Sequence, residues 1–472
     1  MKNLALACTA LCLALTACPR RVDTSEREPW PGGQGREPAA QGGTATTPED
    51  RRVVTEPQPP LREAVPAVVG VAVPLSGKNE AWGKAVLAGV SLAIAEGGPH
   101  HVVARDTRGE PDGAARAIEE LAAEGVTAIV GGVTNAEARS AAETAQRLGV
   151  PLVSLSKLEG IPSAGPFVFR TMLTAEAQAK ALVEFAMGRR GHKRFAVMFP
   201  NVSYGQELAQ AFWDDVEQRG GQITGAESYE PDRTTFSPLV KSLVGKANLD
   251  DRADYRELAQ EIVKNEKDPY RRRKALEKLR ERLPPVTDFD AVFIPDFARN
   301  VALIAPALAV EDVVSATCDA AEVERVRKAT GRADLAPVQL LGANGWDDPD
   351  LVDRAGRYVQ CSVFVDGFFA GSERPETKRF VDTFQARYGR VPSILEASAY
   401  DAAALIRTTS ERGAASRDEV RRILQGIQLP GATGNISFDE RREVVKPLFF
   451  LTVDGDGIRE LRPEELAPPG AG

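Results

Sequence analysis

The feature that most constrains the fold is a regular alternation of short apolar runs with longer amphipathic segments. The first run, Val68 to Val73, is continuous and β-branched, as expected for a parallel strand covered on both faces. Pro74 ends it, because proline cannot donate to a strand ladder. Amphipathic segments of roughly ten to fifteen residues separate the later runs, which predicts βαβ units and a parallel sheet.

The alternation restarts at about residue 193, which predicts a second sheet. Strands of the first sheet are expected at 68–73, 101–106, 126–132, 151–156 and 167–171. Strands of the second are expected at 193–200, 222–229, 289–295, 338–342 and 359–366. Near Asp366 the chain returns to the first sheet. We therefore predict an α/β fold of two doubly wound parallel-sheet lobes, whose strand ends are where such sheets bind ligands.

The N-terminus has the features of an export leader. Lys2 supplies a positive charge, and the apolar core from Leu4 to Leu15 is too short to span a bilayer as a mature helix. The sequence then runs through Leu15-Thr16-Ala17-Cys18, which resembles the lipobox of bacterial lipoproteins. We expect residues 1–17 to be a signal peptide and Cys18 to carry the lipid. An ordinary secretory cleavage site beside a chance cysteine is the alternative.

Two segments are expected to lie outside the sheets. Residues 18–66 are rich in proline, glycine, threonine and charge without an apolar period, which predicts a disordered tether. Residues 246–285 alternate acidic and basic side chains around a thin leucine stripe, with a break at Pro269. There we expect a solvated helical hairpin, with a protein-docking surface as the alternative.

Composition and motifs argue against several classes of function. The net charge of -8 disfavours nucleic-acid binding, which usually needs a basic face. Only three histidines are present, which weakens the case for histidine-dependent catalysis or a zinc site. The chain has no G-x-S-x-G, no H-E-x-x-H and no phosphate-binding loop, and Asp454 and Asp456 lack the later spacing of a calcium loop. We therefore expect a protein that is not an enzyme and uses no cofactor or metal.

The order of several short motifs is distinctive. It comprises PLSG after the first strand, then Gly131-Gly132-Val133-Thr134, Ser154-Leu155-Ser156, Phe169-Arg170-Thr171, Tyr204-Gly205, Phe293-Ile294-Pro295-Asp296 and Leu341-Gly342-Ala343-Asn344-Gly345-Trp346. With this order, Val68 to about Leu461 resembles the type I periplasmic binding proteins, most of all the leucine/isoleucine/valine-binding receptors of ABC transporters. The resemblance implies two lobes joined by three crossovers, closing on a ligand.

The resemblance also implies domain limits. Lobe 1 is expected to comprise residues 67–188 and 367–430, and lobe 2 residues 189–366 and 431–462, with 246–285 as the charged insertion. A short tail, 463–472, would follow.

The resemblance places a ligand site at the strand ends. In the family, hydroxyls and backbone N–H groups at helix N-termini of the first lobe bind the ligand carboxylate. Aromatic side chains from the first loop and from the mouth of the second lobe cover the ligand, and Trp82 and Tyr204 match them. Each matching hydroxyl could instead be a plain helix cap or turn residue. The expected ligand-binding residues are Ser76, Trp82, Thr134, Asn135, Ser154, Ser156, Tyr204, Asp296 and Asn344.

One position departs from the amino-acid receptors of this family. Their loop matching Gly342 to Gly345 carries a glutamate that binds the ligand ammonium, and this chain has Asn344 there. Asp296, at the end of a neighbouring strand, could supply the charge instead, or could simply cap a helix.

Two cysteines, Cys318 and Cys361, are the only ones after Cys18. Outside the cytoplasm such a pair can form a disulfide. We expect either a bridge between them or two separate thiols.

The sequence thus favours a lipid-anchored, extracytoplasmic solute receptor that passes a small polar, amino-acid-like ligand to an ABC permease. A lipoprotein that activates penicillin-binding proteins through contacts with cell-wall synthases is the main alternative, and a sensory receptor module is another. Pro19 follows Cys18 where an inner-membrane retention aspartate would stand, which slightly favours the outer membrane.

Overall fold

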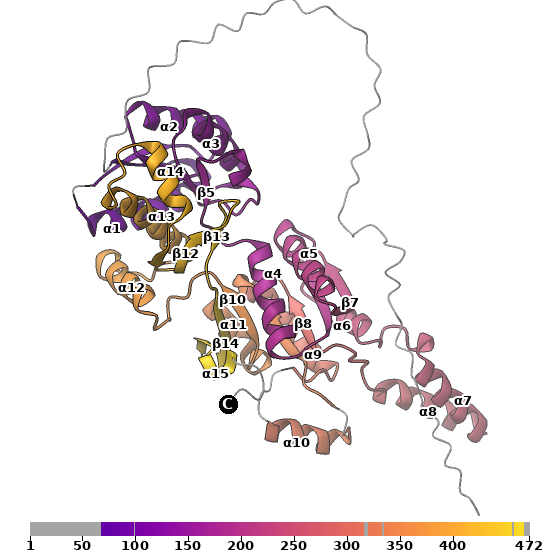
Figure 1. Ribbon diagram of the computed structural model, residues 1–472. Helices are drawn as coiled ribbons and strands as arrows, with labels where there is room; N and C mark the ends of the chain where they lie inside the picture. The colour runs from indigo at the N-terminus through magenta and orange to yellow at the C-terminus, as the bar shows by residue number, and fades with distance from the viewer. Residues whose placement is uncertain (1–67, 99, 316–319, 333–334, 456, 467–472) are drawn as a thin grey trace, which may run out of the picture.

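The computed structural model describes residues 68–98, 100–315, 320–332, 335–455 and 457–466. The expected signal peptide, Cys18 and the whole tether lie outside the described residues. The described chain forms two α/β lobes, the first largely indigo with orange and yellow additions, the second magenta to orange with the yellow C-terminal elements β14 and α15 (Figure 1). The predicted fold class is confirmed.

Lobe 1 is built on a five-stranded parallel sheet with the order β2-β1-β3-β4-β5. Its helices α1, α2 and α3 lie between successive strands, because the crossovers of a parallel sheet must pass over its faces. The elements are β1 (Val68–Val73), α1 (Glu80–Ala95), β2 (His101–Asp106), α2 (Pro111–Ala123), β3 (Ala128–Gly131), α3 (Asn135–Leu148), β4 (Leu152–Ser154) and β5 (Val168–Arg170).

The C-terminal part of the chain completes lobe 1. Helix α13 packs along α1, and Phe380, Tyr400 and Phe438 join the same buried apolar cluster as Val71 and Val130. Figure 1 shows α13 and α14 against the indigo elements. The added elements are α12 (Pro375–Tyr388), α13 (Ile394–Glu411), α14 (Arg417–Gln425) and the small sheet β11 (Leu429–Gly431), β12 (Gly434–Phe438) and β13 (Val444–Val445).

Lobe 2 is built on a seven-stranded sheet with the order β15-β14-β10-β9-β8-β6-β7. Its strands β6 to β10 are parallel, and β14 and β15 add an antiparallel edge. The strands are β6 (Arg194–Pro200), β7 (Gln222–Tyr229), β8 (Ala291–Ile294), β9 (Gln339–Gly342), β10 (Val363–Asp366), β14 (Phe449–Asp454) and β15 (Gly457–Glu460). The helices are α4 (Ala175–Val183), α5 (Ser203–Gln218), α6 (Ser237–Leu243), α9 (Ala298–Val310), α10 (Ala320–Thr330), α11 (Pro349–Ala355) and α15 (Pro463–Leu466).

The packing places the lobe boundaries differently from the predicted limits at 188 and 430. Helix α4 belongs with lobe 2, because Leu182 and Phe185 lie in one apolar cluster with Phe195. Residues 431–445 belong with lobe 1, where Arg442 and Glu443 lie beside β5. Arg170 N–H donates to the Arg442 carbonyl oxygen at 3.1 Å, and the Arg170 guanidinium pairs with Glu443 at 2.6 Å. Sequence periodicity does not show which sheet a flanking helix covers.

The charged insertion forms a helical hairpin of α7 (Ala253–Asn265) and α8 (Pro269–Arg282), as predicted. The break lies at residues 266–268, just before Pro269, and the Asp268 carboxylate caps α8 by accepting from Arg271 N–H at 2.8 Å. Proline is favoured in the first turn, where its missing N–H leaves no hydrogen bond unmade. The hairpin projects from lobe 2, away from both sheets (Figure 1).

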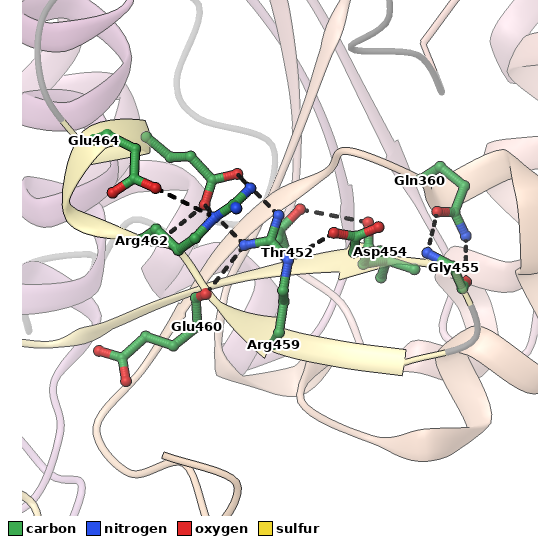
Figure 2. Close-up of polar contacts among 10 residues, drawn as sticks. Gln360, Thr452, Asp454, Gly455, Arg459, Glu460, Arg462 and Glu464 are labelled. Atoms are coloured by element: carbon green, nitrogen blue, oxygen red, sulfur yellow. Dashed lines mark hydrogen bonds and ion pairs between the residues drawn. The ribbon is translucent and has the colours of Figure 1, made fainter. Parts of the chain in front are cut away.

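Asp454, the first of the two acidic residues considered for calcium, lies at the end of a strand. Asp454 ends β14 and accepts from Arg459 Nε at 2.7 Å, while Gln360 holds Gly455 through both backbone groups, at 2.7 and 3.0 Å (Figure 2). Gly455 has a φ of 60°, which glycine adopts without strain. Asp456 lies outside the described residues.

The two later cysteines are only partly covered by the structure. Cys361 is disulfide-bonded, and it precedes β10. Cys318 lies outside the described residues, so the Cys318–Cys361 pairing stays a prediction.

A test of the contact between α1 and α13 follows from Gly89. A β-carbon there would lie closer than van der Waals contact to the Glu396 carbonyl oxygen and 3.0 Å from Tyr400 N. We expect Gly89→Ala to lower the free energy of unfolding by about 1–3 kcal/mol through overpacking, measured by chemical denaturation. Gly188→Ala is the control, because nothing lies within 4 Å of its β-carbon position. Equal stability of the two variants would contradict the close packing.

Candidate functional site

The parallel strands of the two lobes lie in the same order when they are counted along the chain. Lobe 1 has β2-β1-β3-β4-β5, and lobe 2 has β7-β6-β8-β9-β10. In each lobe, the second strand lies on one side of the first strand and the third strand on its other side. The carboxyl ends of strands at such a reversal form the ligand crevice of open α/β sheets. Every residue predicted for the site follows a strand at this edge, in the loops after β1, β3, β4, β6, β8 and β9.

The loop after β3 is closed on itself by a capping box. Thr134 caps α3 and accepts from Glu137 N–H at 3.3 Å. The Glu137 carboxylate in turn accepts from the N–H groups of Val133 at 2.8 Å and Thr134 at 3.0 Å. Burial raises the pKa of Glu137, which is fully enclosed. Two of the backbone donors expected for a ligand carboxylate are therefore occupied by the protein itself.

The predicted serines also bind within lobe 1. Ser154 Oγ donates to Gly132 O at 3.2 Å, and Ser156 Oγ donates to Asn135 Oδ1 at 3.1 Å. Both serines are fully buried, whereas Asn135 is exposed in the first turn of α3. The hydroxyls fix the loops, and Asn135 is the member of this group that faces solvent. A ligand role for Thr134, Ser154 and Ser156 stays a prediction.

The loop after β1 carries an exposed aromatic. Ser76 Oγ donates to Asp106 Oδ2 at 2.6 Å, which ties this loop to the end of β2. Hydrogen bonds from Ser76 and from backbone N–H groups lower the pKa of Asp106, against the opposing effect of burial. Trp82, in the first turn of α1, has 51% of its surface exposed. An indole left this open at the strand edge is available for contact.

Lobe 2 contributes a pair of stacked aromatics. The Tyr204 and Phe297 rings lie 4.7 Å apart and nearly parallel. Tyr204 OH donates to Asn344 Oδ1 at 3.0 Å and accepts from Gly345 N–H at 3.0 Å, which brings together the loops after β6, β8 and β9. Phe297 remains 55% exposed. We did not single out Phe297 from sequence, although its place after the buried strand β8 was a signal.

The Asp296 carboxylate is fully hydrogen-bonded within lobe 2. Its carboxylate accepts from Tyr229 OH at 2.6 Å, Asn300 Nδ2 at 2.9 Å and Phe297 N–H at 2.7 Å, and the residue is 2% exposed. Burial and the Asp296 charge raise the pKa of Tyr229. Helix α9 has Phe297 as its N-cap residue and no side-chain cap, so Asp296 is held by hydrogen bonds within lobe 2 without capping the helix. A ligand role for Asp296 stays a prediction.

The lobes meet in a small gap near the crossovers. Lys157, from the loop after β4, lines it opposite Tyr204, Glu207 and Asn344 of lobe 2. The gap holds about 40 Å³, which is room for a water molecule and not for an amino acid. Lys157 and Glu207 are exposed, and sequence analysis missed both, because only the meeting of the lobes brings them to the site.

Two carboxyl groups lie deeper in lobe 2. Burial, and then the charge of Asp348, raise the pKa of Asp347 to about 7. Burial and the charge of Asp347 also raise the pKa of Asp366, which ends β10. Asp366 Oδ1 accepts from Gly367 N–H at 2.5 Å at the start of a crossover.

A larger cavity, of about 850 Å³, extends from the end of β5 and the loop after β4. It runs along α4 and the segment 439–450, on the side of the crossovers, and its walls include Lys180, Phe185 and Phe450. The described residues contain no cluster of three or more His, Cys, Asp or Glu side chains placed to bind a metal ion. Within the described ranges, no helix combines the length and apolarity needed to cross a bilayer.

Two lobes of one strand order, with facing strand ends and three crossovers, define a two-lobed ligand receptor of the type I class. The model of the periplasmic binding protein family matches residues 66–249 and 293–457. The chain therefore belongs to the periplasmic binding protein family, as its motifs indicated. Membership of a family of binding proteins agrees with the expectation that it is not an enzyme. The unmatched interval contains the α7–α8 hairpin.

Individual relatives are more distant. The Leu/Ile/Val-binding protein homolog 3 of Brucella melitensis is 28% identical over 185 residues, covering 37% of this chain and 50% of that protein. A Streptococcus pneumoniae branched-chain amino acid transporter substrate-binding protein, solved with isoleucine, has a TM-score of 0.53 at 21% identity, covering 83% and 97% of the two chains. A Rhodopseudomonas palustris solute-binding protein, solved with 3,4-dihydroxybenzoic acid, has a TM-score of 0.54 at 20% identity, covering 82% and 93%. These structures share the fold.

The raised pKa of Asp347 predicts a pH-dependent stability. An unfolded aspartate titrates near pH 4, whereas folded Asp347 titrates at about 7, so the folded state holds an extra proton in this window. Stability should therefore fall as pH rises from about 4 to about 7. We expect Asp347→Asn to raise the melting temperature by a few degrees at pH 8 and much less at pH 4.5. Asp353→Asn, on the exposed side of α11, is the control. An Asp347→Asn effect that is equal at both pH values would refute the assignment.

Proposed function

We propose that this protein is an extracytoplasmic solute receptor that closes its two lobes on a small carboxylate with an apolar body and delivers it to an ABC permease. The observation that carries the proposal is the pair of half-exposed aromatics, Trp82 on lobe 1 and Phe297 on lobe 2, at facing strand edges. Aromatic faces left open on two separate lobes suit a flat or branched apolar group held between them.

Polar groups at the same edges suit the carboxylate. The first turn of α3 carries exposed Asn135, and a helix N-terminus favours negative charge. Lys157 adds a cation from the neighbouring loop. These groups replace the hydroxyls of Ser154 and Ser156, which are occupied by bonds inside lobe 1.

The ammonium group of an amino acid needs an anion, and Glu207 is the candidate. It is the acidic residue that lines the gap between the lobes, whereas Asp296 is enclosed and fully bonded. Burial, and then the charge of Glu159, raise the pKa of Glu207, and a ligand cation would relieve this repulsion. An amino acid would engage Glu207, and an aromatic acid without an amino group would not. Fold relatives solved with isoleucine and with dihydroxybenzoic acid provide precedent for both.

Lipid attachment at Cys18 and an envelope location are part of the same proposal. The Leu15-Thr16-Ala17-Cys18 sequence supports them, and the long tether would leave the lobes free to reach a permease. Mass spectrometry of the N-terminal peptide from native membranes tests this part, and an unmodified Cys18 would remove it. Outer-membrane sorting remains a secondary expectation from Pro19.

A thermal-shift screen tests the ligand class. Branched and aromatic amino acids and hydroxybenzoates are the panel, and a true ligand at one hundred times its Kd adds about 2.7 kcal/mol of stability. We expect Trp82→Ala and Phe297→Ala each to weaken binding of the best ligand by about tenfold or more, measured by calorimetry. Both residues are half-exposed, so neither change should unfold the protein.

Tyr270→Ala, on the distant hairpin, is the matched aromatic control, at 61% exposure. If no panel member shifts the melting temperature while a cell-wall synthase binds the purified protein, the receptor proposal fails in favour of the penicillin-binding-protein activator alternative.

Glu207→Gln separates the two ligand classes. Loss of a charged hydrogen bond costs about 1.5–3 kcal/mol, so an amino-acid ligand should bind about 10- to 100-fold more weakly, while an aromatic acid should be little affected. Isothermal titration of both kinds of ligand measures the difference. Glu143→Gln, an exposed change on α3, is the control. An amino acid that binds equally well to Glu207→Gln would exclude Glu207 as the ammonium partner.

A further inference from the structure

Helix α8 is strongly basic within an acidic protein. Its sequence, PYRRRKALEKLRER, holds seven Lys or Arg and two Glu, whereas the chain as a whole carries a net charge of -8. Its partner helix α7, ADYRELAQEIVKN, holds three acidic and two basic residues. Positive charge is therefore concentrated on one of the two hairpin helices.

Four of these cations form a row. Arg271, Lys274, Lys278 and Arg282 follow one another at spacings of three and four, which places them on one side of the helix. All four are exposed, and the row is about 16 Å long at 1.5 Å per residue. We call these four residues the basic row.

The basic row makes few bonds within the protein. Lys274 pairs with Glu277 at 3.1 Å. In the described part of the chain, no ion pair is formed by Arg271, Lys278 or Arg282. Two other cations of α8 do bond within the protein: Arg280 Nε donates to Tyr255 OH at 2.8 Å, and Arg273 lies over the Tyr270 ring. The row is free to meet an external anion.

The position of the hairpin leaves the row accessible. In Figure 1, α7 and α8 project from lobe 2, away from both sheets. The hairpin is joined to the lobe at its base, where Val286 N–H donates to Val244 O at 3.0 Å. The family model does not cover residues 250–292, so this element is an addition to the receptor fold.

We propose that the basic row docks on a membrane surface containing anionic phospholipid. Phosphates on a bilayer form a flat negative array, and each Lys or Arg held near it strengthens binding about fivefold. An interface with a folded protein usually has an apolar centre and few lysines. The exposed large apolar residue of α8 is Tyr270, at the hairpin tip with Val263, where side chains of this kind suit the bilayer interface.

The proposal does not depend on the ligand. A docked hairpin would hold lobe 2 at the bilayer while the crossovers leave lobe 1 free to move. It would act together with the lipid on Cys18, adding electrostatic attraction of lobe 2 to a chain that the acyl groups hold at the bilayer.

Vesicle co-sedimentation tests it. The full chain carries Cys18→Ala in every arm, so that no acyl chain contributes. It is mixed with vesicles of phosphatidylcholine alone or of phosphatidylcholine with about 30% phosphatidylglycerol, which supplies the anionic lipid. We expect binding to the anionic vesicles that weakens as salt is raised, because screening shortens the reach of the charges. Changing the row to Arg271→Gln, Lys274→Gln, Lys278→Gln and Arg282→Gln should weaken it by about two to three orders of magnitude, about fivefold for each charge.

A charge-matched control makes the test specific. Arg325→Gln, Lys328→Gln, Arg354→Gln and Lys378→Gln remove four exposed cations from other helices and should retain most of the binding. Equal binding by the row variant and the original chain would overturn the proposal, as would equal binding to neutral vesicles. Absence of vesicle binding, with capture of an acidic protein that requires the row, would overturn it in favour of a protein partner.

Discussion

The packing of α13 along α1 is the contact on which the rest of the structure depends. These helices are about three hundred residues apart in sequence, yet they share one apolar cluster, and Gly89 lets the backbones approach closely. Because α13 must return to lobe 1, the chain crosses between the lobes three times, at about residues 171–174, 367–374 and 446–448. Three crossovers hold the strand ends of the two sheets opposite each other and still permit a hinge motion.

The third crossover is anchored by buried charge. Lys446 Nζ donates to Thr433 Oγ1 at 2.8 Å, and Thr433 Oγ1 donates to the Asp401 carboxylate at 2.7 Å. Burial lowers the pKa of Lys446 to about 8, while the Asp401 and Asp366 charges oppose this shift. Removing one member of such a network leaves a buried charge without its partner, which is costly. The network thus fixes where the tail leaves lobe 1, and hence the register of β14 in lobe 2.

The strand-end loops are stabilised by their own side chains. Glu137 occupies the N–H groups before α3, the Asp296 carboxylate is fully bonded, and Ser156 ties the loop after β4 to Asn135. Loops held in this way present a fixed shape to a ligand at little ordering cost. Under the proposed function, the groups left for recognition are exposed rings and a few charged side chains, so we expect selectivity to rest on apolar shape more than on the capping hydroxyls of the family pattern.

Sequence by itself determined the fold class and the position of nearly every central strand, because a covered parallel strand must be apolar and must end in a turn. It also indicated a site at the strand ends, which stays a prediction. It also located the hairpin, since alternating charge with a leucine stripe permits little else. It could not assign α4 or residues 431–445 to a lobe, because amphipathic periodicity shows that a face is buried but not against which sheet. It could not separate Ser154 and Asp296, which are bonded internally, from Lys157, Glu207 and Phe297, which remain open. Ser154 bonds to Gly132, 22 positions away, and Asp296 to Tyr229, 67 positions away. Only the tertiary structure decides which of these groups meet and which stay exposed.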